Sequence, residues 1–174
     1  MLTNWESSIT LFIFNVIVYA LIQYLRVFID PYLPESWFSP KQKYYKCYAW
    51  EDNGKFYDRV FKVSKWKDYL PTVNSSTNFN KKKITGRGVD YFEQFLQEIN
   101  MAESHHIRSI LTTLVFALWN PSGMFIFFFM LSAAAQLPFI IIQRYNRPRM
   151  QKVVYDLRVR ENTIKITNVA PIVE

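Results

Sequence analysis

Two long apolar stretches constrain this chain more than any other feature of its sequence. The first, residues 9–29, has Asn15, Gln23 and Arg26 as its only strongly polar side chains. It is about as long as the ~20 residues that a helix needs to cross the hydrocarbon core of a bilayer. The residues before it contain Glu6 but no Lys or Arg, and no small-x-small cleavage site follows. We therefore interpret this stretch as a retained membrane anchor rather than a cleaved signal peptide.

The second apolar region is divided by the turn residues Asn120–Gly123. The arm after the turn, residues 124–142, is long enough to span a bilayer by itself. The arm before it, residues 107–119, is short but continues a helix that we predict from Val89. We therefore predict a helical hairpin, and the alternative is a re-entrant pair that never fully crosses. The fold class predicted is an all-α integral membrane protein with about three transmembrane helices, at 9–29, 107–119 and 124–142.

Basic residues predict the orientation of these helices. The net charge is +7, yet the first eight residues and the Asn120–Gly123 turn contain no Lys or Arg. The basic residues gather instead in the loop 30–106 and in the tail 143–174. We therefore predict a multi-pass protein of the cell membrane, with its N-terminus outside and the loop and the tail cytoplasmic, and treat residues 1–174 as a single membrane domain. Cys47 is the only cysteine, which excludes an internal disulfide framework.

The cytoplasmic loop has an amphipathic character. Phe56, Val60, Val63, Lys67 and Leu70 fall at helical spacing before Pro71, which predicts a helix suited to an anionic lipid surface. For the aromatic segment Tyr44–Trp50, the periodicity leaves open a short strand or an interfacial helix. The polar stretch Thr72–Gly88 is predicted to be a loop. Its lysines, Lys81–Lys83, have no neighbours that would read or stack on bases, so we expect no nucleic-acid partner.

The helix predicted from Val89 carries the clearest chemical signal. A single stripe recurs at intervals of three and four residues, and it places Glu103 and His106 on one face near the membrane. A histidine held by a carboxylate is a common general base, because the carboxylate fixes the tautomer and stabilises the imidazolium. The alternative is a structural polar pair. His105 lies off this stripe. The stripe consists of Val89, Phe92, Leu96, Ile99, Glu103, His106 and Ile110.

Other kinds of site have less support in the sequence. A di-iron bundle needs a second Glu-x-x-His motif, and the chain has only two histidines. A Gly-x-Ser-x-Gly hydrolase elbow is absent from the sequence. We therefore expect no metal and no organic cofactor.

Two basic motifs are candidate ligand sites. Arg144, Arg147 and Arg149 lie within six residues at the end of the last apolar stretch. Arginine offers a two-pronged donor to phosphate and carboxylate, which favours an anionic headgroup or a phosphate-bearing donor. A simple stop-transfer flank is the alternative. Residues 65–67, Lys-Trp-Lys, similarly suit either an interfacial anchor or a ligand contact.

These motifs together resemble the glycosyl-4,4'-diaponeurosporenoate acyltransferases of staphyloxanthin-type carotenoid biosynthesis. The resemblance covers roughly residues 41–149 and depends on four features in the same order. They are Gly54-Lys55-Phe56, Lys65-Trp66-Lys67, Ala102-Glu103 with His106 and Ser109-Ile110, and Gln143-Arg144-Tyr145-Asn146-Arg147-Pro148-Arg149. The doubled histidine and the polar 72–88 loop are departures from the family's pattern.

The resemblance implies transfer of a fatty acyl group to a sugar hydroxyl of a glycosylated carotenoid acid. An acyl thioester would be the donor and a membrane glycolipid the acceptor, with Glu103 and His106 as the catalytic pair. The substrate-binding residues would be Lys65, Trp66, Lys67, Arg144, Asn146, Arg147 and Arg149. Three helices enclose two lipid substrates poorly, so a homo-oligomer or a complex with pathway enzymes is a further hypothesis. The alternatives are an acyltransferase acting on another glycolipid and a non-catalytic scaffold that binds anionic lipid.

Overall fold

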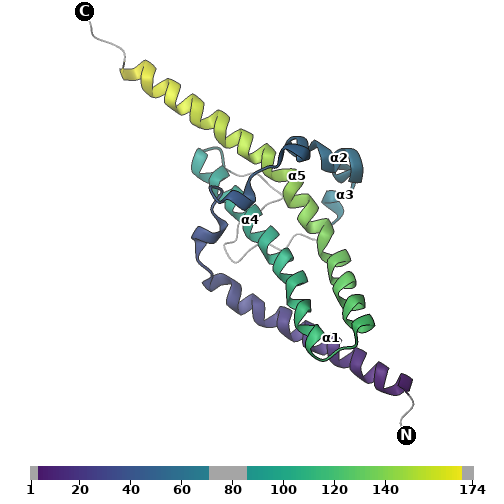
Figure 1. The fold of residues 1–174 in the computed structure, drawn as a ribbon. Coiled ribbons are helices and arrows are strands. Elements are labelled where there is room, and N and C mark those ends of the chain that lie inside the picture. Colours follow the sequence, from purple (N-terminus) through teal and green to yellow (C-terminus); the bar gives the residue numbers. More distant parts are fainter. Residues whose placement is uncertain (1–3, 71–85, 170–174) are drawn as a thin grey trace, which may run out of the picture. The chain divides into compact units, whose positions relative to one another are not determined.

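The computed structural model describes residues 4–70 and 86–169, and within them the chain forms helices and turns without a β-strand. Figure 1 labels the five α-helices. They are α1 (Asn4–Ile29), α2 (Lys55–Phe61), α3 (Val63–Trp66), α4 (Val89–Leu111) and α5 (Ser122–Val169). The 3₁₀ segments are η1 (Asp30–Tyr32), η2 (Glu35–Phe38), η3 (Lys43–Tyr45), η4 (Ala49–Gly54), η5 (Lys67–Tyr69) and η6 (Thr112–Leu118). Most of the predicted loop Thr72–Gly88, including Lys81–Lys83, lies outside the described residues.

The chain divides into two compact units. The first unit comprises Met1–Trp37 and Glu103–Ile140, and the second comprises Phe38–Ala102 and Ile141–Glu174. Helices α4 and α5 therefore contribute residues to both units. Each unit is described by itself below.

Two of the described helices are long and apolar enough to cross a membrane: α1 within Ser8–Arg26, and α5 within Ser122–Thr167. Their apolar side chains face outward, with Ile17 60% exposed in α1 and Met130 59% exposed in α5. Apolar surface on this scale is costly in water and suits a lipid surrounding. These two helices, the first and last predicted spans, support membrane association. Helix α4 does not meet the same criterion of length and apolar composition. Three spans remain a prediction.

Asn15, the polar interruption in α1, has a structural explanation within the first unit. Its side chain is fully buried and accepts a hydrogen bond from the Trp119 indole N–H at 2.8 Å. Its amide N–H₂ donates to Asn120 Oδ1 at 2.6 Å. An unpaired amide in an apolar surrounding would be costly. Asn15 therefore links α1, through these hydrogen bonds, to the turn between η6 and α5.

The first arm of the predicted hairpin is not one regular α-helix. Helix α4 ends at Leu111, and the chain continues as the 3₁₀ segment η6 up to the turn. Two threonine hydroxyls donate to carbonyls three residues earlier, from Thr112 to Ser109 O at 2.8 Å and from Thr113 to Ile110 O at 2.6 Å. Side chains of this type compete with the helical hydrogen-bond ladder, and 3₁₀ turns are common at helix ends.

The predicted stripe of α4 is confirmed as a buried face in the second unit. Val89, Phe92 and Leu96 form a core cluster with Val154 of α5. The helix begins at Val89, as its periodicity predicts. The apolar spacing of three and four residues therefore determines which side of α4 packs against α5.

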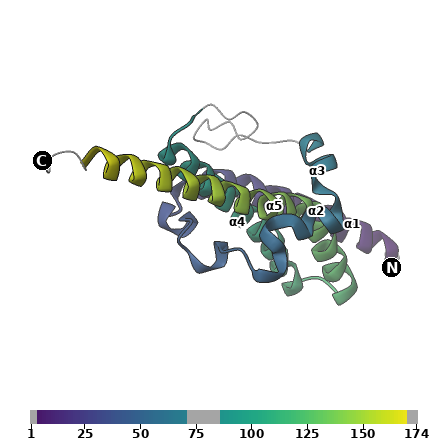
Figure 2. The ribbon, with the colours of Figure 1, turned by 90° about the horizontal axis from the view of Figure 1, so that it is seen from above.

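The predicted single helix over residues 56–70 is wrong, because the chain turns at Lys62. This residue has a left-handed backbone with φ +53°, which separates α2 from α3. The Asp58 side chain accepts the backbone N–H of Ser64 at 2.9 Å, and this hydrogen bond lowers the pKa of Asp58. Val63 then becomes fully buried against Tyr57 and Tyr145, so the α2–α3 segment packs on α5. Both views show α2 beside α5 (Figures 1 and 2).

The last predicted span does not end its helix at residue 142. Helix α5 continues through the basic motif and the predicted tail to Val169. Its segment beyond Ile141 is amphipathic, with Val154 buried and Tyr155 68% exposed. The tail is thus helical for most of its length.

Candidate active site

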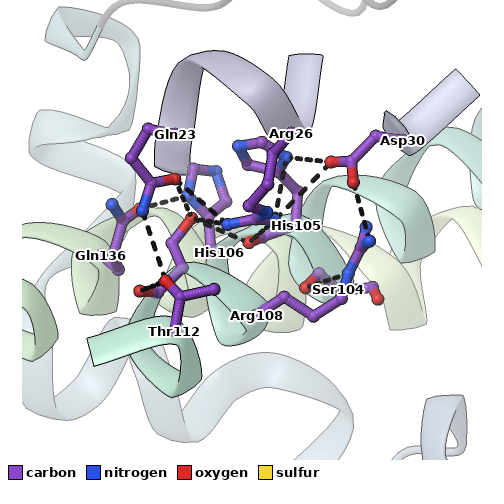
Figure 3. Close-up of polar contacts among 10 residues, drawn as sticks. Gln23, Arg26, Asp30, Ser104, His105, His106, Arg108, Thr112 and Gln136 are labelled. Atoms are coloured by element: carbon purple, nitrogen blue, oxygen red, sulfur yellow. Dashed lines mark hydrogen bonds and ion pairs between the residues drawn. The ribbon is translucent and has the colours of Figure 1, made fainter. Parts of the chain in front are cut away.

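His106 is held by two side chains of α5 within the first unit. Its Nδ1 lies 2.6 Å from the side-chain oxygen of Gln136 (Figure 3). Its ring stacks on Phe139, with centroids 4.7 Å apart and planes 12° from parallel. Since a carbonyl oxygen only accepts, Nδ1 carries the proton in this arrangement and Nε2 has the lone pair. The ring therefore presents Nε2 as its basic atom.

His105, the neighbouring residue, is paired with a carboxylate. Its Nδ1 lies 2.7 Å from Asp30 Oδ2, and its side chain is 40% exposed. Asp30 Oδ1 also accepts a hydrogen bond from Arg108 at 2.8 Å. Burial lowers the pKa of His105 below its ordinary value, and the hydrogen bond that the His105 ring donates to Asp30 acts in the opposite direction. His105 thus has a carboxylate partner, Asp30, that the sequence analysis did not identify.

Arg26 connects the end of α1 to α4. Its guanidinium donates to Ser109 Oγ at 2.6 Å and to the backbone oxygen of His105 at 2.9 Å. It also lies 3.6 Å from Asp30. These contacts fix one turn of α4 against α1, so both histidines stand on a constrained segment (Figure 3).

Glu103 lies on α4 one turn before His106, as the sequence predicts. Its side chain is buried, with 1% exposed. Residues three apart on a helix are neighbours on its surface. The use of Glu103 and His106 as one catalytic pair stays a prediction.

The arginines of the basic motif belong to the second unit and differ in their exposure. Arg147 is buried, donates to Asn100 Oδ1 at 2.9 Å, and stands over the Tyr45 ring at 5.1 Å. Burial lowers its pKa to about 10. Asn100 in turn donates to the backbone oxygen of Phe38 at 2.9 Å. Arg147 therefore joins α4, α5 and the η2–η3 segment.

Arg144 faces a buried carboxylate. Its guanidinium lies 3.5 Å from Glu51 Oε1 and donates to the backbone oxygen of Tyr44 at 3.2 Å. Glu51 is 1% exposed and accepts hydrogen bonds from the Tyr57 hydroxyl at 2.5 Å and the Tyr48 N–H at 2.6 Å. Burial and Glu51 raise the pKa of Tyr57. The Glu51 carboxylate thus organises the η4 segment around Arg144.

Arg149 is the exposed arginine of the motif, although its side chain folds back onto α5. It donates to the backbone oxygen of Tyr145 at 2.5 Å and lies 3.6 Å from the centre of the Tyr145 ring. Asn146, which the resemblance also implies, is half-buried. Gly54 lies against the same turn of α5, so closely that an added Cβ would stand 2.9 Å from the Tyr145 backbone oxygen. Two motifs far apart in the sequence, Gly54-Lys55-Phe56 and 143–149, are therefore in contact.

The Lys65-Trp66-Lys67 motif lies at the end of α3 and the start of η5. The Trp66 indole N–H donates to the backbone oxygen of Phe61 at 2.7 Å, and its ring packs on the Tyr57 cluster. Lys65 is exposed, and Lys67 pairs with Asp68 at 3.0 Å. Of these three residues, Lys65 is the most accessible to a ligand.

Sequence reasoning missed four residues that organise these sites: Asp30, Gln136, Glu51 and Asn100. A polar residue inside an apolar stretch could have indicated Gln136, because such residues need a partner. The other three are ordinary loop and helix polar residues with no local signal. No group of three potential metal ligands was found among the described His, Cys, Asp and Glu residues.

Comparison with known proteins identifies the same family that the sequence motifs resemble. The model of the glycosyl-4,4'-diaponeurosporenoate acyltransferase family matches residues 34–155. A protein with that name from Staphylococcus haemolyticus is 28% identical over 131 residues, covering 74% of this chain and 75% of the relative. A Staphylococcus aureus protein (strain COL) with the same name is 29% identical over 130 residues, covering 74% and 78%. No solved structure matches. The chain is therefore a member of the glycosyl-4,4'-diaponeurosporenoate acyltransferase family.

Proposed function

We propose that this protein transfers a fatty acyl group from a thioester to a sugar hydroxyl of a glycosylated diaponeurosporenoate in the membrane. The family match over residues 34–155 is the observation that carries this proposal. The relatives' names specify the glycosylated carotenoid acid as the acceptor, which favours it over another glycolipid. The exposed apolar faces of α1 and α5 support a site that receives its lipid substrate from the bilayer.

His106 acts as the general base in this proposal. Its Nε2 takes the proton of the sugar hydroxyl while the hydroxyl oxygen attacks the thioester carbonyl carbon. A C–O bond forms, the C–S bond breaks, and the departing thiolate takes the proton back to leave as a thiol. A positioned general base contributes about 10²–10⁴-fold to such a reaction. Buried Glu103, one turn earlier on α4, stabilises the imidazolium that forms.

Residues of the basic motifs bind the donor. Lys65 and Arg149 are exposed and suit the phosphates of a thioester carrier. Arg144, Asn146 and Arg147 fix the turn of α5 that presents Arg149. Trp66 and Lys67 support Lys65 from the end of α3, and Trp66 packs on the Tyr57 cluster.

The topology proposed is an external N-terminus with the basic segments on the cytoplasmic side, where acyl thioesters are made. This orientation follows from the distribution of Lys and Arg in the sequence. A second copy of the chain or a pathway enzyme would complete the enclosure of the two lipid substrates.

The test uses cells that produce the glycosylated carotenoid acid. Wild type, His106→Gln and His105→Gln would be compared by mass spectrometry of extracted pigments at matched membrane levels. We expect wild type to form an acylated glycoside and His106→Gln to accumulate its unacylated precursor. Full acylation by His106→Gln with loss in His105→Gln would assign the base to the Asp30-paired histidine instead. No acylated pigment from the wild type would reject the proposed acceptor.

A further inference from the structure

Adjacent histidines of α4 have different kinds of partner. His105 meets a charged group, Asp30, at 2.7 Å, whereas His106 meets a neutral amide, Gln136, at 2.6 Å. Figure 3 shows these partners on separate segments of the first unit, η1 for Asp30 and α5 for Gln136. The Nδ1 atoms of the two rings therefore contact different elements.

The Gln136 amide is a costly group at its place in the sequence. It interrupts the apolar stretch 124–142, directly after three alanines. Polar side chains at membrane depth need partners and often mark functional sites. Its side-chain oxygen is 2.6 Å from His106 Nδ1, which is within hydrogen-bonding distance.

This contact decides which nitrogen of His106 is basic. In neutral imidazole one nitrogen donates and the other accepts, and the hydrogen bond of one nitrogen sets the state of the other. An accepting oxygen at Nδ1 holds the proton there and leaves the lone pair on Nε2. Phe139, one turn after Gln136 on α5, stacks on the ring at 4.7 Å and restricts its rotation. The two α5 residues together fix the tautomer and the direction of the ring.

We propose that Gln136 is the positioning residue of the His106 base and acts by holding its Nδ1–H tautomer. This inference rests on the proposed role of His106 in acyl transfer. A neutral amide orients the ring without adding a charge that would favour imidazolium. Gln136 thereby sets the direction of the Nε2 lone pair, while Glu103, one turn earlier on α4, stabilises the imidazolium in the proposed reaction.

The experiment compares Gln136→Leu and Gln136→Glu with wild type in lipid nanodiscs, using a tag without histidine. Gln136→Leu removes the acceptor, and we expect kcat to fall about 10–100-fold, the range known for residues that orient metal-binding histidines. We expect KM to change less than about threefold, because the substrate is not touched. In Gln136→Glu, the carboxylate favours imidazolium, so the acidic limb of the pH–rate profile should move upward by about one unit or more. Gln151→Glu, the same exchange elsewhere on α5, should not move it.

Nitrogen-15 NMR of labelled histidine gives a second readout that does not depend on activity. The chain has only two histidines, so a His105→Gln sample assigns the His106 signals. We expect a proton on Nδ1 of His106 in wild type and a shift towards the Nε2–H form in Gln136→Leu. A wild-type proton on Nε2, or an unchanged tautomer in Gln136→Leu, would overturn the inference. Full activity of His106→Gln with the expected tautomer would reject the proposed base and leave the hydrogen-bond assignment intact.

Discussion

Replacing Gly54 with alanine tests the contact that joins two of the family motifs. Gly54 has φ +84°, a left-handed backbone that costs other residues about 1–2 kcal/mol. A Cβ at this position would also lie 2.9 Å from the Tyr145 oxygen and 3.4 Å from the Pro148 ring. The oxygen belongs to the backbone of α5 and cannot move aside cheaply.

The expected loss of stability combines both effects. Backbone strain costs about 1–2 kcal/mol and overpacking about 1–3 kcal/mol. We expect a total of roughly 2–4 kcal/mol, because one local shift of the backbone relieves part of both effects. For a chain of this size, 1 kcal/mol corresponds to about 2–4 °C in Tm, so the midpoint should fall by roughly 4–16 °C.

The single cysteine provides the assay. Burial and the charge of Glu51 raise the pKa of the Cys47 thiol to about 11, so it reacts slowly with a maleimide dye until the surrounding segment unfolds. Thermal unfolding in detergent can then be followed by dye fluorescence. Gly123→Ala is the matched control, because a Cβ there meets nothing within 4 Å. A Gly54→Ala midpoint equal to that of Gly123→Ala would refute the reasoning.

Three further perturbations test separate contacts. Asn15→Leu removes the group that accepts from the Trp119 indole and donates to the Asn120 side chain. It should cost about 1–3 kcal/mol, and an unchanged midpoint in the same dye assay would contradict this. Asp30→Asn removes the carboxylate shared by Arg26, His105 and Arg108. We expect a loss of about 2–4 kcal/mol in the free energy of unfolding, after allowance for the partial exposure of Asp30. The control is Asp156→Asn, at an exposed pair with Lys152, which should cost less than about 1 kcal/mol. Glu51→Gln removes a charge that raises the pKa of Cys47. The thiolate fraction of Cys47 at mildly alkaline pH should therefore increase, and with it the rate of alkylation by iodoacetamide. An unchanged rate would mean that burial alone raises the pKa of this thiol.

The helix boundaries that depend on local sequence were predictable. The anchor ends at Ile29 before Asp30 and Pro31, and α4 begins at Val89 with its apolar stripe buried. Periodicity reports which face of a helix is apolar, and that is what packs. The break at Lys62 was missed because it depends on a side-chain hydrogen bond between Asp58 and Ser64, which no apolar pattern records.

The sequence predicts which residues belong to the candidate site, but not which residues contact them. Sequence spacing places Glu103 and His106 on one face of α4. It gives no information on which residue of α5 meets that face, so the Gln136 contact required the packed structure. The same holds for Asp30, which reaches His105 from a different element, and for Glu51, which reaches Arg144. These contacts join residues far apart in the chain, and their geometry is fixed only by tertiary packing.

Acyl transfer by the purified protein tests the central claim most directly. Wild type and His106→Gln would be reconstituted in nanodiscs with the glycosylated carotenoid acid and an acyl thioester carrying a labelled acyl group. We predict that wild type forms labelled acyl glycoside and free thiol in equal amounts, and that His106→Gln forms both about 10²–10⁴-fold more slowly. Thiol release without labelled glycoside, or equal rates for the two proteins, would contradict the account.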